Sequence, residues 1–121
     1  MISKKGMGMV DLADLTQRYV EAFNSRDLDV IATMLHDEFT LTDPSVRGVG
    51  PKEKALEVIQ GLFEMAGNSL SFSARNIYVS GSTSFIEFDL ELNGDELEGT
   101  DIIEWQGDKL IEMRAYVNSK P

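Results

Sequence analysis

Residues 17–48 read QRYVEAFNSRDLDVIATMLHDEFTLTDPSVRG, and the rest of the chain is organised around them. It contains two helical patterns followed by an alternating segment from Phe39 to Asp43, which stops at Pro44. Residues two apart in a strand share a face, so Phe39, Leu41 and Asp43 point the same way. A carboxylate on an apolar face costs free energy unless something uses or neutralises it. Asp43 is therefore a candidate functional residue.

The helix before this segment carries a second polar group on its apolar side. We expect this helix to run from about Asp11, as N-cap, to Asn24. Its apolar stripe places Tyr19 among Leu12, Leu15, Ala22 and Phe23, so a phenol faces the core. A buried phenol and a buried carboxylate together indicate the wall of a cavity.

The remaining periodicity predicts an α+β fold. A second helix is expected from the Asp27 cap through Leu35, with His36 at its end, and a third from Pro51 to about Gly67. Strand patterns cover residues 70–80, 84–92, 97–106 and 109–118, joined by the tight turns 81–82, 93–94 and 107–108. We expect a cone in which three N-terminal helices pack on one face of a curved, mostly antiparallel sheet. The strand at Phe39 would pair at one edge.

Composition limits the class of protein. The length of 121 residues predicts a single domain, residues 11–121, after a flexible N-terminal tail, residues 1–10. The net charge of -10 argues against nucleic acid and anionic membranes as partners. The lack of cysteine fits a cytoplasmic protein, and one histidine with no cysteine offers no metal ligand set.

A second carboxylate is expected inside the sheet. In the strand 97–106, Asp101 shares parity with Ile103 and Trp105. A base that removes a proton next to a carbonyl must be ionised, and the developing oxyanion needs donors that are preferably neutral. A phenol serves as such a donor, and so does a carboxylic acid that an apolar setting keeps protonated. Asp101 has the surroundings for that acid, and Asp43, next to a loop, is better placed to stay ionised.

The inward parity also predicts the apolar wall of the cavity. In the last strand we expect Ile111, Met113, Ala115 and Val117 to point inward. The substrate pocket is expected to comprise Phe23, Phe39, Leu41, Val58, Leu62, Phe88, Ile103, Trp105 and Met113.

The sequence resembles the bacterial ketosteroid isomerases (steroid Δ-isomerases) of the NTF2-like/SnoaL-like superfamily. The resemblance lies in Q-R-Y-V around Tyr19, the D-L-D helix cap and the strand ending in Asp43-Pro44. It resumes more weakly at residues 99–105, which contain Asp101, and at residues 113–115. It implies Tyr19 as the oxyanion-hole phenol, Asp101 as its protonated partner and Asp43 as the proton shuttle, with no cofactor. Unlike some family members, this chain has no tyrosine on the third helix; Tyr78 and Tyr116 lie on later strands.

Several functions remain open at this point. The first is an enzyme that moves a proton within a small apolar carbonyl compound through an enolate. The others are a SnoaL-like polyketide cyclase-type enzyme and a non-catalytic NTF2-like ligand-binding or assembly module. Taken alone, Tyr19 reads as a core tyrosine, Asp43 as a turn residue and Asp101 as a paired inward polar group. The resemblance also implies a steroid-like or polyketide-like ligand and a homodimer formed through the outer sheet face.

Overall fold

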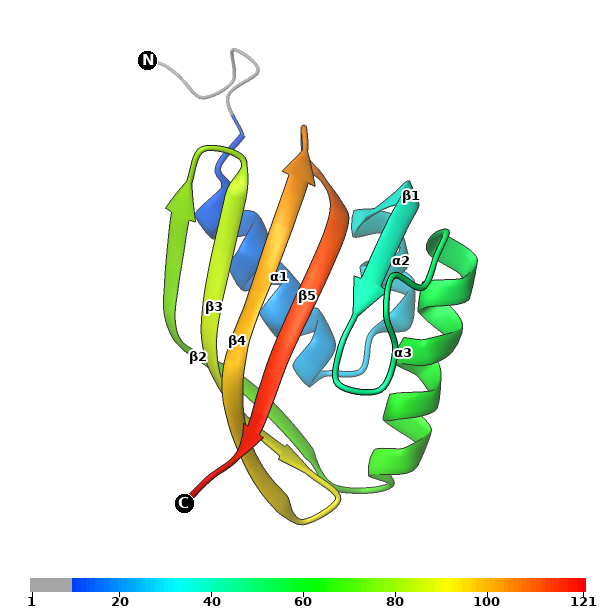
Figure 1. The fold of residues 1–121 in the computed structure, drawn as a ribbon, viewed down its shortest axis with the longest axis vertical. Helices are drawn as coiled ribbons and strands as arrows, with labels where there is room; N and C mark the ends of the chain where they lie inside the picture. Colours follow the sequence, from blue (N-terminus) through cyan, green and yellow to red (C-terminus); the bar gives the residue numbers. More distant parts are fainter. Residues whose placement is uncertain (1–9) are drawn as a thin grey trace.

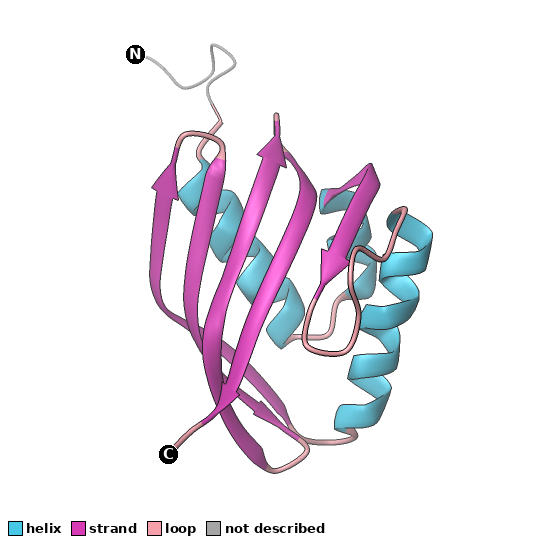
Figure 2. Ribbon diagram, viewed as in Figure 1, coloured by secondary structure: helices cyan, strands magenta, loops and turns pink. Residues whose placement is uncertain are grey.

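The computed structural model describes residues 10–121, which form three helices and five strands (Figures 1 and 2). In chain order these are α1 (Leu12–Asn24), α2 (Leu28–Met34), β1 (Leu35–Thr42), α3 (Lys52–Ala66), β2 (Leu70–Ser80), β3 (Thr83–Leu92), β4 (Asp95–Gln106) and β5 (Lys109–Ser119). The predicted tail lies almost wholly outside the described residues. Within them, no helix is both long enough and apolar enough to span a membrane.

The sheet has the strand order β1-β5-β4-β3-β2. β1 pairs in parallel with β5, whereas β2 to β5 form an antiparallel meander. Helix α1 crosses one face of this sheet and α3 lies beside β1 (Figure 1). The ends of β2, β3 and β4 near the 93–94 turn curve toward the C-terminal end of α3 (Figure 2). The prediction of an α+β fold, three helices on a mostly antiparallel sheet, is confirmed.

The helix starts follow their predicted caps. The Asp11 carboxylate accepts a hydrogen bond from the Asp14 amide at 3.0 Å, and Asp27 caps α2 in the same way. The end of α2 differs from the prediction, because Leu35 has extended backbone angles and pairs with β5. His36 therefore lies in a strand, where its Nδ1 accepts from the Glu38 amide at 3.0 Å, and it does not end the helix as predicted.

The parity prediction for β5 fails over its first residues. The register between β4 and β5 shifts after Glu104, and Trp105 pairs with Leu110, so Ile111 is the extra residue of a bulge. Leu110 is fully buried and Ile111 only half-buried, the reverse of the expectation. Beyond the bulge the predicted parity holds, and Met113 is buried.

Close approach of two strands explains a glycine at position 99. A Cβ atom added to Gly99 would overlap the carbonyl oxygen of Tyr116 and lie 2.9 Å from Cζ of Phe88. At this position β4 and β5 therefore lie so close together that only glycine, which has no Cβ atom, fits. This contact lies two residues before Asp101, so it fixes where the strand carries that carboxyl group.

Candidate active site

A cavity of about 250 Å³ lies between α1, α3 and the inner face of the sheet. Its wall is formed by residues from every strand and from two helices. The ionisable groups that line it are Tyr19, Asp43 and Asp101, the three predicted site residues. The rest of the lining is apolar except for Ser45. One apolar space therefore holds two carboxyl groups and one phenol.

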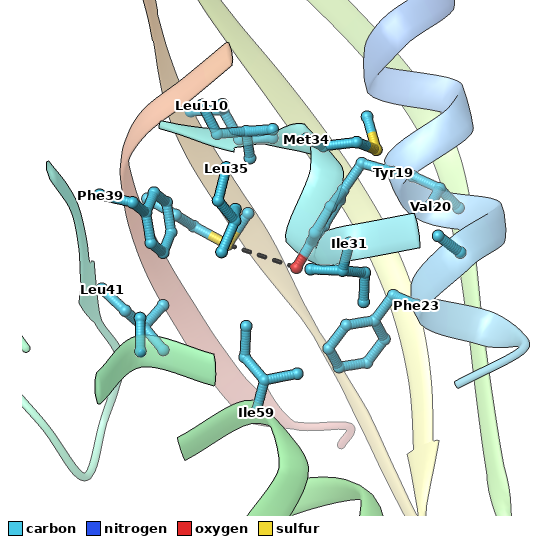
Figure 3. Close-up of a cluster of buried hydrophobic side chains, with 14 of the residues drawn as sticks. Tyr19, Val20, Phe23, Ile31, Met34, Leu35, Phe39, Leu41, Ile59 and Leu110 are labelled. Atoms are coloured by element: carbon cyan, nitrogen blue, oxygen red, sulfur yellow. Dashed lines mark hydrogen bonds between the residues drawn. The ribbon is translucent and has the colours of Figure 1, made fainter. Parts of the chain in front are cut away.

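Tyr19 reaches the cavity from the buried face of α1. Its side chain is only 3% exposed, and its hydroxyl donates to the sulfur of Met113 at 3.6 Å. Figure 3 shows this contact as the dashed line from the Tyr19 oxygen. Burial, together with the nearby charge of Asp101, raises the pKa of the Tyr19 phenol well above its ordinary value. The hydroxyl stays protonated at neutral pH, and a thioether is a weak acceptor that a ligand oxygen can replace.

Asp101 lies deeper, in the middle of β4, between Ile86 of β3 and Ala115 of β5. It is 5% exposed, and no lysine, arginine or histidine within residues 10–121 lines the cavity beside it. Burial therefore raises the pKa of its carboxyl group from 3.8 to about 7. Near neutral pH the side chain exists in both forms, and the protonated form can donate a hydrogen bond to a ligand.

Asp43 stands at the mouth of the cavity, just after β1. Its Oδ1 atom accepts hydrogen bonds from the Ser45 amide at 2.7 Å, the Ser45 hydroxyl at 2.8 Å and the Val46 amide at 2.9 Å. The loop folds back on β1 through paired bonds between Leu41 and Val49. The turn-residue interpretation of Asp43 is thus true of one oxygen, while the side chain remains half-buried and lines the cavity.

Six of the apolar residues expected in the pocket line the cavity: Phe23, Leu41, Val58, Leu62, Phe88 and Met113. Phe39, Ile103 and Trp105 do not, although all three are buried on the predicted face. Each residue along a strand advances about 3.3 Å, so side chains two or four residues away point into a different part of the core. Figure 3 shows Phe39 near Leu35 and apart from the cavity-lining Ile59.

Trp105 belongs to a separate buried polar network at the other end of β4. Its indole Nε1 donates to the Ser84 hydroxyl at 2.8 Å, and that hydroxyl lies 2.8 Å from the Thr16 hydroxyl. Thr16 also donates to the Leu12 carbonyl at 2.6 Å. These bonds satisfy every polar atom of the three side chains, so the network is structural.

Several lining residues were missed. Ala115 and Val117 were expected to point inward, Leu90 and Leu92 share parity with Phe88, and Leu97 shares parity with Asp101, so the alternation of the strands indicated all five. Ile59 lies on α3 between the predicted pocket residues Val58 and Leu62. Phe72, Pro44 and Ser45 had no such signal.

The remaining tyrosines do not support Tyr19. Tyr78 and Tyr116 are 54% and 55% exposed, and α3 contributes Val58, Ile59 and Leu62 to the cavity. Over the described part of the chain, no three histidine, cysteine or acidic residues are arranged to hold a metal ion.

The sequence matches the family model of the SnoaL-like domain over residues 16–113. The chain therefore belongs to the SnoaL-like family, which shares the NTF2-like fold. No curated protein matched the sequence.

Solved structures support the same fold at low identity. A candidate ketosteroid isomerase from Kribbella flavida is 15% identical, with a TM-score of 0.78 over 90% of this chain and 78% of that one. An LEH-like epoxide hydrolase from M. tuberculosis is 12% identical, with a TM-score of 0.69 over 88% and 81%. A hypothetical protein from Catenulispora acidiphila with a ketosteroid isomerase-like fold, in complex with trimethylamine, is 13% identical, with a TM-score of 0.72 over 84% and 83%. The fold thus serves different chemistries and holds small ligands.

Proposed function

We propose that this protein is a ketosteroid-isomerase-like enzyme that moves a proton within a small apolar carbonyl compound through an enolate. The observation that carries the proposal is the convergence of Tyr19, Asp43 and Asp101 on one apolar cavity. The family and fold agree with it, but they are shared by proteins of other activities.

In this proposal Asp43 takes the proton from the carbon next to the carbonyl and returns it to another carbon. Its Oδ1 atom is held by the Ser45 and Val46 donors, which leaves Oδ2 to act as the base. A base in this position contributes roughly 10²–10⁴-fold to the rate.

Tyr19 and the protonated form of Asp101 donate to the oxygen that gains negative charge. Both are neutral and shielded from water, so their hydrogen bonds strengthen as charge develops. In this proposal the carbonyl oxygen of the substrate replaces the Met113 sulfur as the acceptor of the Tyr19 hydrogen bond.

The size of the cavity favours a compact substrate. Its volume of about 250 Å³ is below the roughly 300–1,000 Å³ typical of sites for drug-sized ligands. A monocyclic β,γ-unsaturated ketone is therefore a better match to this space than a steroid.

The proposal is tested by conversion of a β,γ-unsaturated ketone to its conjugated enone, followed by absorbance. The two substrates are a β,γ-unsaturated ketosteroid and cyclohex-3-en-1-one. Each is assayed with wild-type protein and with Asp43→Ala. We expect wild-type turnover that Asp43→Ala reduces at least a hundredfold, about the lower bound for loss of a base. No turnover of either ketone, or equal turnover by the variant, contradicts the proposal.

A non-catalytic ligand-binding module is the second candidate. The three bonds to one oxygen of Asp43 favour it, because they are what a purely structural turn residue makes. Binding of a phenolic ketone analogue separates the two candidates. An oxyanion site makes the bound phenol ionise more readily than in solution, and a merely apolar pocket does not.

We further propose that the protein forms a homodimer through the outer face of the sheet. This face exposes Tyr78 and Tyr116, and its acidic charge is partly neutralised within the chain. Arg114 contacts Glu104 at 2.9 Å and Glu112 at 3.1 Å. Repulsion across a two-fold axis is reduced accordingly. Light scattering at micromolar concentration tests the assembly, and a monomer mass contradicts it.

A further inference from the structure

The cavity wall carries acidic groups and no basic side chain. Asp43 and Asp101 line it, and none of the lysines, arginines or the histidine of the described residues does so. The chain as a whole has a net charge of -10. When both carboxyl groups are ionised, an anionic ligand is repelled, because like charges interact strongly in a space of low dielectric constant.

Aromatic rings surround the same space. Tyr19, Phe23, Phe72 and Phe88 all line the cavity and form a continuous series. Their successive ring centroids are 6.1, 4.9 and 5.1 Å apart. Figure 3 shows the first two, Tyr19 and Phe23, side by side on α1. Aromatic faces attract organic cations, and grouped aromatic rings are the usual site for quaternary ammonium groups.

We propose that this cavity also binds small organic cations, either quaternary ammonium compounds or protonated hydrophobic amines, with Asp101 as the counter-ion among the aromatic rings. This ligand class goes beyond the proposed isomerase, because Asp101 acts here as a charged acceptor and not as a neutral donor. The cavity of about 250 Å³ equals the liquid volume of about eight water molecules, each ~30 Å³, so a cation the size of choline fits.

The charges around Asp101 determine how binding depends on pH. The ionisable groups facing it are Tyr19 from α1 and Asp43 from the loop after β1, whereas α3, β2, β3 and β5 contribute only apolar side chains to the cavity. Tyr19 stays protonated, since burial raises its pKa. Asp101, with a pKa of about 7, is the deeply buried group that changes charge near neutral pH.

A cation that binds only the ionised form of Asp101 loses affinity as the pH falls. With a pKa of about 7, about 90% of Asp101 is ionised at about pH 8 and about 1% at about pH 5. The apparent affinity should therefore fall roughly 90-fold between these values. A neutral ligand that accepts a hydrogen bond from protonated Asp101 shows the opposite trend.

The test compares choline with its uncharged isostere 3,3-dimethylbutan-1-ol by NMR titration at about pH 8 and about pH 5. We expect choline to bind more tightly at the higher pH and the isostere to show no such preference. Asp101→Asn should abolish the pH dependence. Glu57→Gln, which removes one charge from an exposed position on α3 outside the cavity, should retain it.

Equal binding of choline at both pH values, or no binding at the higher pH, overturns the proposal. A second measurement needs no variant: carboxyl-carbon NMR of the wild type should show that choline ionises Asp101 at about pH 6. An unchanged Asp101 signal in the presence of saturating choline also overturns it. Because both measurements follow binding and not turnover, failure of the isomerase proposal leaves them unaffected.

Discussion

The stability of this protein should depend on pH through Asp101. Burial raises the pKa of this carboxyl group from 3.8 to about 7, with no basic partner in the cavity to offset it. Between these two pH values the folded protein holds a proton that the unfolded chain has released. The stability that protonated Asp101 contributes is therefore fully present below about pH 4. It is lost as the pH rises to about 7, at about 1.4 kcal/mol per pH unit.

Asp101→Asn removes the ionisation while keeping nearly the same shape. The difference of about three pKa units corresponds to about 4 kcal/mol, so at about pH 8 the variant should be more stable than wild type by up to this amount. This electrostatic gain should vanish toward about pH 4, where both side chains are neutral. Imperfect hydrogen bonding of the buried amide reduces the gain by about 1–3 kcal/mol.

Denaturant unfolding followed by the fluorescence of Trp105, the only tryptophan, measures this difference. Wild type, Asp101→Asn and the exposed control Glu57→Gln are compared at several pH values. The control corrects for the change in net charge. An Asp101→Asn gain that is the same at about pH 4 and about pH 8, or a variant less stable than wild type at about pH 8, refutes the reasoning.

Three further substitutions separate structure from chemistry. Gly99→Ala should destabilise by at least about 1–3 kcal/mol in thermal unfolding, because the new methyl group overlaps the Tyr116 carbonyl; unchanged stability contradicts that close approach. Tyr19→Phe should change unfolding free energy by less than about 1 kcal/mol, since it loses only a weak bond to Met113, yet it should lower ketone turnover at least tenfold; unaltered turnover argues against an oxyanion role. Thr16→Val should cost about 1–3 kcal/mol in denaturant unfolding, because the buried Ser84 hydroxyl keeps its bond from Trp105 but loses its partner on α1. The kcat of any ketone turnover should be retained; a large fall in kcat links this network to the site.

The sequence predicted the elements of the fold because its local and long-range signals agree. Asp11 and Asp27 act as the expected caps, and the four strands of the meander begin and end within two residues of their predictions. The Asn93-Gly94 turn has the positive φ angles that such a hairpin requires. Leu35 is the exception: it fits the helical pattern of the sequence, but it belongs to β1 because it pairs with Leu110 of β5.

The candidate pocket was predicted less completely, because parity defines a face and not a position along it. Phe39, Ile103 and Trp105 lie on the correct face yet beyond the cavity. The bulge at Ile111 reversed the parity of the first part of β5, and nothing in the alternation of that strand indicates an extra residue. Residues that follow a strand, such as Ser45, depend on how the loop folds back.

The same parity rule selected Asp43 and Asp101, but the structure gives them opposite surroundings. Donors from the loop reach Asp43 because Pro44 ends the strand and the chain turns back at once, which brings the Ser45 and Val46 amides to one carboxylate oxygen. Asp101 lies in mid-strand, where the amides are used in sheet pairing and none is free to stabilise a charge. Burial without such donors raises the pKa of the Asp101 carboxyl group, so the protonated form is favoured there. The division of roles that we propose for the two aspartates therefore rests on where each lies relative to the end of its strand.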